Sequence, residues 1–343
     1  MSLFLSLGAG TILSGVGVAD ALMQPAKTYL QIVGGFCILN ALIPICSSYL
    51  RAFGFSKEPL YASIIGNVIN FCLNAFFLFV LHKGVAGVAT ATVISRIINL
   101  VIVVLLGAVL VKAKQHPERE SNREVMGQII RIGLPSACET AIYNVSMTLV
   151  IRFLNQMDAQ GLNVTARSYT MQITNFSYCV GAALAQANAI MTGWHIGAKE
   201  YDACDRGTKK AAVIGVIVAV ILETVFTLCS GWIMQLFSKD PQMVSLVGKL
   251  LAIDIVLEIG RVTNLVYGQA LKTSGDAVFP VVMGACFMIL CSVGGTYLFG
   301  IRLGLLAVGA YIGMTGDECV RAVGMYLRWK SGKWKEKGLV KSR

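Results

Sequence analysis

A charged stripe interrupts the apolar stretch 243–271, where Asp254, Glu258 and Arg261 stand at positions i, i+4 and i+7. A helix would place all three on one face, so Glu258 can pair with Arg261, and Asn264 extends the stripe. Charge inside a bilayer is retained only when it is paired or functional. The stripe therefore predicts either a permanent structural ion pair or a coupling site, in which a carboxylate alternates between an arginine and a proton or cation.

A second charged cluster, Asp317, Glu318 and Arg321, lies in the last apolar stretch, 303–327. Asp317 and Arg321 are four residues apart, so they can pair on one face of a helix. The cluster is nearer to the basic C-terminal end of the chain. We interpret it as a gating contact or a structural ion cluster.

Glu139 is a third candidate, because it is a carboxylate that follows Pro135 by four residues inside an apolar stretch. Carboxylate oxygens suit Na⁺ or a proton equally, so Na⁺ is a candidate ligand at Glu139 and at Glu258. Asn144 is rotated from Glu139 by about 140° on a helix, so a shared site does not follow. We keep Asn144 and Asn264 as candidates for binding the coupling cation or substrate, and assign no role to the isolated Glu223.

The elements that position these residues are membrane-spanning helices. The chain of 343 residues is 56% hydrophobic and 14% charged, whereas soluble domains carry roughly 25% charged residues. A span needs about 20 mostly apolar residues. Apolar stretches fall at 2–22, 30–51, 60–81, 85–111, 126–154, 165–193, 208–236, 243–271, 277–299 and 303–327. We expect an all-α, polytopic membrane protein of about ten helices, with a short first helix.

The basic residues indicate how the chain is oriented. Nineteen of the 29 Lys and Arg residues lie in alternate connections and at the C-terminal end, against six on the opposite side. Cytoplasmic loops carry this excess of basic residues. We predict a cytoplasmic C-terminus with Lys335 inside, Asp158 outside, and location in the cytoplasmic membrane. The net charge of +11 is therefore no indication of nucleic acid as a partner.

An internal repeat divides the chain into two lobes. The segment Leu50-Arg-Ala-Phe-Gly-Phe-Ser-Lys-Glu-Pro59 matches Leu271-Lys-Thr-Ser-Gly-Asp-Ala-Val-Phe-Pro280 at an offset of 221, and Gly84 matches Gly304 at 220. Copies with the same topology form parallel halves related by an axis along the membrane normal. At this offset the first half lacks counterparts for about two and a half helices. We expect an N-terminally truncated lobe whose Asn67, Asn70 and Asn74 would face hydrocarbon without partners.

Four motifs resemble the multidrug and toxic compound extrusion (MATE) family of cation-coupled transporters. They are Ile132-Gly-Leu-Pro-Ser-Ala-Cys-Glu139, Gly193-Trp-His-Ile-Gly197, the 271–280 segment, and Arg328-Trp-Lys-Ser-Gly-Lys-Trp334. The resemblance implies twelve helices in two six-helix lobes around a central cavity, of which this chain covers the third to the twelfth. The divisions are then a truncated N-lobe at 1–115, a cytoplasmic inter-lobe loop at 116–124, a C-lobe at 125–328, and a basic cytoplasmic tail at 329–343.

The same resemblance implies an antiporter, driven by Na⁺ or H⁺, that exports drugs or other small amphipathic or cationic molecules. In that family a carboxylate placed like Glu139 belongs to the cation site of the C-lobe. A flippase for lipid-linked saccharides and an inactive transporter fragment are the alternatives. We expect a monomer whose partners are small substrates and membrane lipid.

Other function classes find no support in the motifs. The sequence has no GxxxxGK[ST] loop to cradle phosphates and no HExxH pair, and its His82, His116 and His195 lie at or near loops. The ten cysteines are scattered singly without a CxxC, which does not indicate a zinc site or a disulfide framework. We therefore expect no enzyme activity and no cofactor beyond the coupling ion.

Overall fold

The computed structural model describes residues 2–16, 20–111, 122–157 and 161–337, and the chain is all-α as the sequence predicts, with no strand in those ranges. It divides into two compact units, unit 1 at Met1–Glu118 and unit 2 at Arg119–Arg343. The division falls inside the connection predicted between the lobes, 116–124.

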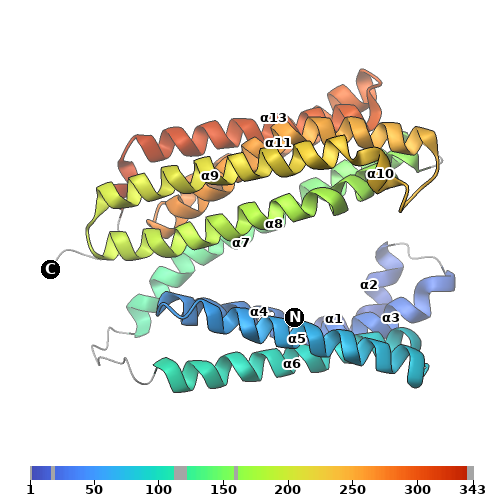
Figure 1. Cartoon of the computed structure of the whole chain (residues 1–343), viewed down its shortest axis with the longest axis horizontal. Coiled ribbons are helices and arrows are strands. Elements are labelled where there is room, and N and C mark those ends of the chain that lie inside the picture. The colour runs from blue at the N-terminus through green and yellow to red at the C-terminus, as the bar shows by residue number, and fades with distance from the viewer. Residues whose placement is uncertain (1, 17–19, 112–121, 158–160, 338–343) are drawn as a thin grey trace. The chain divides into compact units, whose positions relative to one another are not determined.

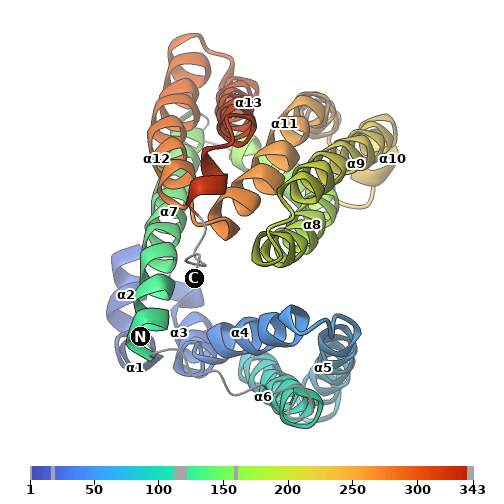
Figure 2. The same cartoon turned by 90° about the vertical axis from the view of Figure 1, so that its left-hand side faces the viewer.

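Unit 1 is built from short and long helices. They are α1 (Ser2–Leu7), α2 (Ala9–Val16), α3 (Asp20–Gly35), α4 (Leu39–Ala52), α5 (Lys57–Ala75) with a π-helical extension (Phe76–Val80), and α6 (Gly84–Val111). Helix α6 packs against α3, α4 and α5 (Figure 2). The small hydrophobic core of unit 1 includes Leu50, Ala62 and Val103.

Unit 2 contains the longest helices of the chain. They are α7 (Asn122–Met157), α8 (Leu162–Gly197), α9 (Tyr201–Leu228), α10 (Ser230–Met234), α11 (Pro241–Thr273), α12 (Val278–Phe287) with π-helical segments at Met288–Val293 and Thr296–Arg302, α13 (Leu306–Lys330), and a 3₁₀ turn (Lys333–Glu336). Figure 1 shows α8, α9 and α11 running side by side, and α11 packs on α8, α9 and α13. Helix α11 is therefore the central helix of unit 2.

Helix α11 begins with a sequence-encoded cap. Asp240 has an extended backbone and its Oδ1 accepts a hydrogen bond from the backbone N–H of Gln242 at 2.9 Å. Pro241 occupies the first helical position, where a missing N–H costs nothing. The helix then continues for 33 residues, far enough to cross a bilayer.

Five helical stretches are long and apolar enough to span a membrane by themselves: Met23–Ala52, Lys57–Val80, Gly84–Val111, Tyr201–Leu228 and Val278–Arg302. Helices α7, α8, α11 and α13 are as long, with 36, 36, 33 and 25 residues, but contain more polar side chains. Helices α7, α11 and α13 hold the charged site candidates identified above, apart from Glu223.

The predicted boundary between the first two helices is wrong. The sequence places a connection at 23–29, because Gln24, Pro25 and Lys27 interrupt the apolar pattern, but these residues lie within α3. The turn at 36–38, after Gly34 and Gly35, separates α3 from α4 within the single apolar stretch Met23–Ala52. Glycine ends helices readily, whereas a polar residue with a long apolar stem does not.

The repeat is visible in matched turns. Gly54 and Gly275 both have positive φ, +89° and +92°. In each turn a backbone N–H reaches back over the helix end, from Phe55 to the carbonyl of Leu50 (3.0 Å) and from Asp276 to that of Leu271 (2.9 Å). Only glycine adopts this conformation without cost, so the shared glycine reflects one turn geometry at an offset of 221.

The second match of the repeat requires a correction. Positive φ angles at His82 (48°) and Gly84 (53°) recur at Gly304 (68°) and Leu306 (53°), which gives an offset of 222 instead of 220. The change from 221 to 222 occurs within α12 and its extension, where the π-helical segment Met288–Val293 has no counterpart in α5. An i→i+5 turn absorbs one additional residue, which explains the shift.

The expectation of unpartnered asparagines in unit 1 is also wrong in two of three cases. The amide of Asn70 donates to the Ser95 hydroxyl at 3.2 Å, and the amide of Asn74 donates to the side-chain oxygen of Asn70 at 3.0 Å. Asn67 is exposed. The first bond joins α5 to α6 and the second lies within α5, whereas Oδ1 of Asn74 is buried without a hydrogen-bond partner among the described residues.

The C-terminal segment of unit 2 is packed against the rest of that unit. Trp329 and Trp334 stack with ring centroids 4.2 Å apart, and both are 1% exposed. Arg328 and Lys337 donate to the two carboxylate oxygens of Asp276, at 2.6 and 2.7 Å. The predicted tail at 329–343 therefore begins with an ordered clasp, formed by Asp276, Arg328 and Lys337.

Candidate functional site

A cavity of about 520 Å³ lies within unit 2, walled by side chains of α7, α8, α11, α12 and α13. Its charged lining is mixed. The acidic members are Glu139, Asp254 and Glu318, and the basic members are Arg167, Arg261, Lys272 and Arg321. Asn144 and Asn264 also line it, so Glu139 and Asn144 border the same cavity despite their angular offset of about 140° on the helix. Most sequence candidates of α7, α11 and α13 thus meet around one space, whereas Glu258 and Asp317 are not part of its lining.

The two ion pairs predicted from helix spacing are confirmed. Arg261 donates to the Glu258 carboxylate one turn earlier on α11. On α13, Arg321 Nε and Nη2 donate to the two oxygens of Asp317, both at 2.8 Å. This bidentate contact matches the planar guanidinium to the planar carboxylate.

The sequence predicted two separate clusters, a coupling stripe on α11 and a gating cluster on α13. In the structure, Glu318 connects the two. Glu318 accepts from Arg321 at 2.9 Å and lies 3.9 Å from Arg261 Nε. It also accepts from the amide of Asn264 at 3.0 Å. One ionic chain therefore runs from Glu258 through Glu318 to Asp317, which in turn accepts from Ser292 at 2.9 Å.

Gly260 makes this joining possible. A Cβ atom at Gly260 would stand 2.8 Å from the backbone nitrogen of Cys319. Only a residue without a side chain allows the two backbones to approach so closely. Helices α11 and α13 are thereby held near enough for Arg261 to reach Glu318.

Glu139 has a partner that helix spacing could not reveal. Lys272, in the last turn of α11, lies with its Nζ 2.6 Å from Glu139 Oε2, and both side chains are largely buried. The sequence placed Lys272 in a connection and Glu139 alone. A cation at Glu139 would have to displace this ammonium, so the pair itself is the state that the structure shows.

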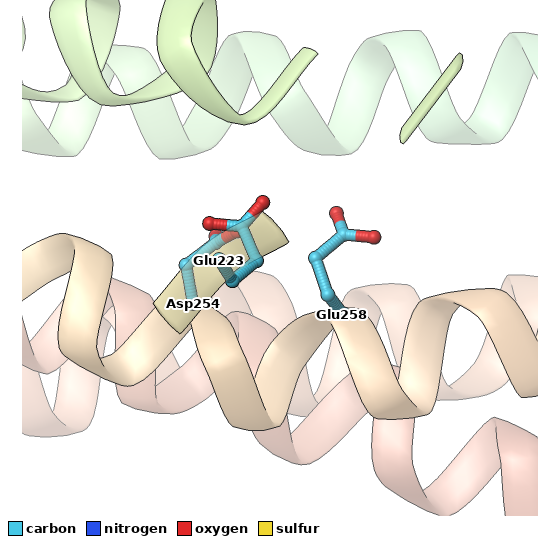
Figure 3. Close-up of side chains that lie close together, drawn as sticks. All are labelled: Glu223, Asp254 and Glu258. Atoms are coloured by element: carbon cyan, nitrogen blue, oxygen red, sulfur yellow. The ribbon is translucent and has the colours of Figure 1, made fainter. Parts of the chain in front are cut away.

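Three carboxylates lie close together beside Arg261, at the Glu258 end of this ionic chain. Side-chain oxygens of Glu223, Asp254 and Glu258 lie within 4.8 Å of one another, as the close-up in Figure 3 shows. All three residues are at most 1% exposed. Both oxygens of Glu223, Oδ2 of Asp254 and Oε2 of Glu258 have no hydrogen-bond partner among the described residues.

This acidic triad could hold a cation. Arg261 pairs with Glu258, whereas Glu223 and Asp254 have no ion-pair partner among the described residues, so three ionised carboxylates here would exceed the positive charge beside them. Hard cations take oxygen ligands, and a bound cation or proton would supply the missing counter-charge. Glu223 had been left without a role. A lone Glu in an apolar helix was itself the signal that could have identified it.

The chain matches known proteins over nearly its whole length. The profile of the MatE family matches residues 1–76 and 135–298. The "Uncharacterized transporter YisQ" of Bacillus subtilis is 34% identical over 335 residues, covering 96% of this chain and 73% of that protein. The "Probable multidrug resistance protein NorM" of Thermotoga maritima is 22% identical, covering 99% and 76%.

Solved structures show the same fold. The "Crystal structure of MATE in the straight conformation" has a TM-score of 0.85 at 18% identity, covering 98% of this chain and 76% of the other. The "Outward-facing conformation of a multidrug resistance MATE family transporter of the MOP superfamily" has a TM-score of 0.85 at 17% identity, with coverage of 98% and 76%. The helices of this chain therefore follow a membrane transporter fold with two pseudo-symmetric lobes.

Proposed function

This chain belongs to the MatE family of membrane transporters, and from that membership we propose a cation-coupled antiporter that exports small amphipathic or cationic molecules across the cytoplasmic membrane. The main support for this proposal is the position of Asp254. Its carboxylate belongs to the buried triad and also lines the cavity. One carboxylate that serves both a coupling cation and a substrate makes their binding mutually exclusive, which is what antiport requires.

The triad supplies the driving site in this proposal. When Na⁺ or a proton occupies it, the charge of Asp254 is neutralised and the cavity loses its unpaired carboxylate. When the cation leaves, Asp254 regains its charge and attracts a cationic substrate. Arg261, shared between Glu258 and Glu318, can follow whichever carboxylate is ionised. Glu139 with Lys272 and Asn144 then contribute to substrate binding in the same cavity.

Neutralising the triad tests the proposal. Asp254→Asn and Glu258→Gln should abolish gradient-driven efflux of ethidium from drug-sensitive cells while the protein remains in the membrane fraction. Imposing a Na⁺ gradient or a pH gradient on proteoliposomes separates the two coupling ions. Glu200→Gln is the matched control, since Glu200 is exposed and pairs only with His195 among the described side chains. Wild-type efflux by both triad variants would exclude the triad from coupling.

The orientation remains part of the proposal. The ordered clasp and the basic segment after it would face the cytoplasm, as the basic residues indicate. Single cysteines introduced at Lys335 into a background without native cysteines should be labelled from inside only. Labelling from outside would reverse the orientation. Asp158, the predicted external marker, lies outside the described residues.

The pairing in the cavity argues against a flippase for lipid-linked saccharides. A pyrophosphate headgroup needs several free cations, but Arg261, Lys272 and Arg321 are each engaged by carboxylates, which leaves Arg167 as the one basic lining residue without such a pair among the described residues. Their positive charge is already balanced. The cavity therefore favours a single organic ion over a polyanion. Membrane lipid as the surrounding solvent and the monomer as the transporting species stay part of the proposal.

A further inference from the structure

Arg167 is a buried cation without a counter-ion. It lies on α8, is 5% exposed, and lines the cavity. No carboxylate of the described residues lies within 4.0 Å of it, the distance that defines the ion pairs above. Among the described residues, its Nη2 donates only to the thioether of Met147, at 3.6 Å, and its Nε is buried with no hydrogen-bond partner.

The packing around Arg167 is largely apolar, and its one hydrogen bond to a described residue is the one to Met147. Its helix neighbours Ala166 and Ile173 belong to the same hydrophobic cluster as Tyr311 and Met314, which also line the cavity. A thioether is a weak acceptor, and a guanidinium carries five N–H donors. A desolvated charge in this state is costly unless something pairs with it. The open side of Arg167 is the cavity, so the partner must come from there.

The ion pairs among the charged residues that line the cavity also leave Arg167 without a partner. Glu139 is paired with Lys272, and Glu318 with Arg261 and Arg321. Asp254 is left as the acidic group without a cation of its own, and Arg167 as the basic group without an anion. The cavity thus presents one unpaired charge of each sign.

We propose that Arg167 binds an oxyanion, typically a carboxylate, of an amphipathic molecule held in the unit 2 cavity, so that the preferred ligand is a zwitterion whose cationic part is attracted by Asp254. This deepens the proposed function by naming the ligand class, and it rests on that function only for the view that the cavity is a substrate site. An anionic lipid headgroup offers the same chemistry and is the second possible source.

A matched pair of dyes tests the proposal. A zwitterionic rhodamine with a free benzoate and its methyl ester share the xanthylium cation and differ only in the carboxylate. Binding of each to the purified full chain is measured by fluorescence anisotropy in nanodiscs of phosphatidylcholine. We expect the free acid to bind roughly tenfold more tightly or better, the range of a hydrogen bond to a charged group.

Variants assign the preference to the residue. Arg167→Gln should bind both dyes alike, and Arg167→Lys should keep part of the preference because it keeps the charge but not the fork. Arg152→Gln, at an exposed arginine of α7, should behave as wild type. Equal binding of the two dyes by wild type, or an unchanged preference in Arg167→Gln, would overturn the proposal.

Stability provides a second, independent readout. Because Arg167 has no partner, Arg167→Gln should melt at or above the wild-type midpoint in detergent without dye. A clearly lower midpoint would show that Arg167 has a structural partner and would also overturn the proposal. Repeating the titrations in phosphatidylglycerol nanodiscs separates the sources. Loss of the wild-type preference there, with no change for Arg167→Gln, would support the oxyanion site and identify lipid as its occupant.

These measurements use no gradient. A chain that fails to couple efflux to a cation can still discriminate between the two dyes. Conversely, coupled export with equal dye binding would leave the antiporter intact and remove Arg167 from recognition.

Discussion

The two units contain the same interhelical contact in a neutral form and in a charged form. In unit 1, Asn70 of α5 donates to Ser95 of α6 at 3.2 Å. In unit 2, at an offset of 222, Ser292 donates to Asp317 at 2.9 Å. One helical turn further along α6 and α13, the same difference recurs. The neutral Asn99 of α6 corresponds to the charged Arg321 of α13.

This difference separates what the fold needs from what unit 2 adds. The helix pair is held in unit 1 by polar but uncharged groups, so the fold does not require ions at these positions. A charge at the bilayer centre costs about 2.5–3.5 kcal/mol on insertion scales. The ionic chain of unit 2 is therefore explained by its connection to the cavity and the triad. We expect perturbations there to exceed their counterparts in unit 1.

The largest expected effect is the loss of Arg321. Arg321→Gln leaves the buried Asp317 without its guanidinium and Glu318 with Arg261 alone, which should lower the free energy of unfolding by about 3–5 kcal/mol. The counterpart Asn99→Leu removes a side chain whose Oδ1 already lacks a hydrogen-bond partner, and should change it by less than about 1 kcal/mol. Denaturant titration in detergent measures both. Equal losses would mean that the charged and neutral contacts are energetically equivalent.

The second largest effect concerns the clasp of Asp276, Arg328 and Lys337, whose contribution to stability should depend on pH. Burial tends to raise the pKa of the Asp276 carboxyl, but hydrogen bonds and charges from Arg328 and Lys337 outweigh it and hold the pKa below its ordinary value. A lowered pKa stabilises the fold above the ordinary value of about 3.9, and this contribution is lost as pH falls toward the folded pKa.

Asp276→Asn should therefore cost about 1.5–3 kcal/mol at neutral pH. Thermal unfolding at several pH values measures the gap between variant and wild type, which should be constant near neutrality and close below about pH 4. Phe55, the counterpart in unit 1, carries no charge, so Phe55→Leu should show no such change with pH. A gap that persists at low pH would mean that packing, and not the charge of Asp276, stabilises the clasp.

The smallest effect concerns the close approach that joins α11 to α13. Gly260→Ala places a Cβ atom against the backbone of Cys319, which cannot move as a side chain would, and should cost about 1–3 kcal/mol. Gly316→Ala on α13 meets no atom within 4 Å and should be neutral or slightly stabilising. Thermal midpoints decide between them. A neutral Gly260→Ala would show that the helices can separate without loss, and that the ionic chain tolerates a wider spacing.

The sequence by itself determined the local features of this protein. Apolar length predicted the helices, because a bilayer admits few other structures. Spacings of three and four residues predicted the pairs of Glu258 with Arg261 and of Asp317 with Arg321, because a helix brings such residues together whatever surrounds it. Gly54 and Gly275 marked equivalent turns, because only glycine adopts their backbone conformation freely.

Only the tertiary structure decided which helices meet. Glu139 pairs with Lys272, and Glu223 lies beside Asp254. These residues are on different helices, so the periodicity of a single helix could not predict that they meet. The close approach at Gly260 joined two clusters that the sequence kept apart, and a π-helical segment moved the repeat from 221 to 222. Arg167 became informative only when its environment showed that no carboxylate reaches it. Pairing between helices depends on their packing, and packing is a property of the folded whole rather than of any one segment.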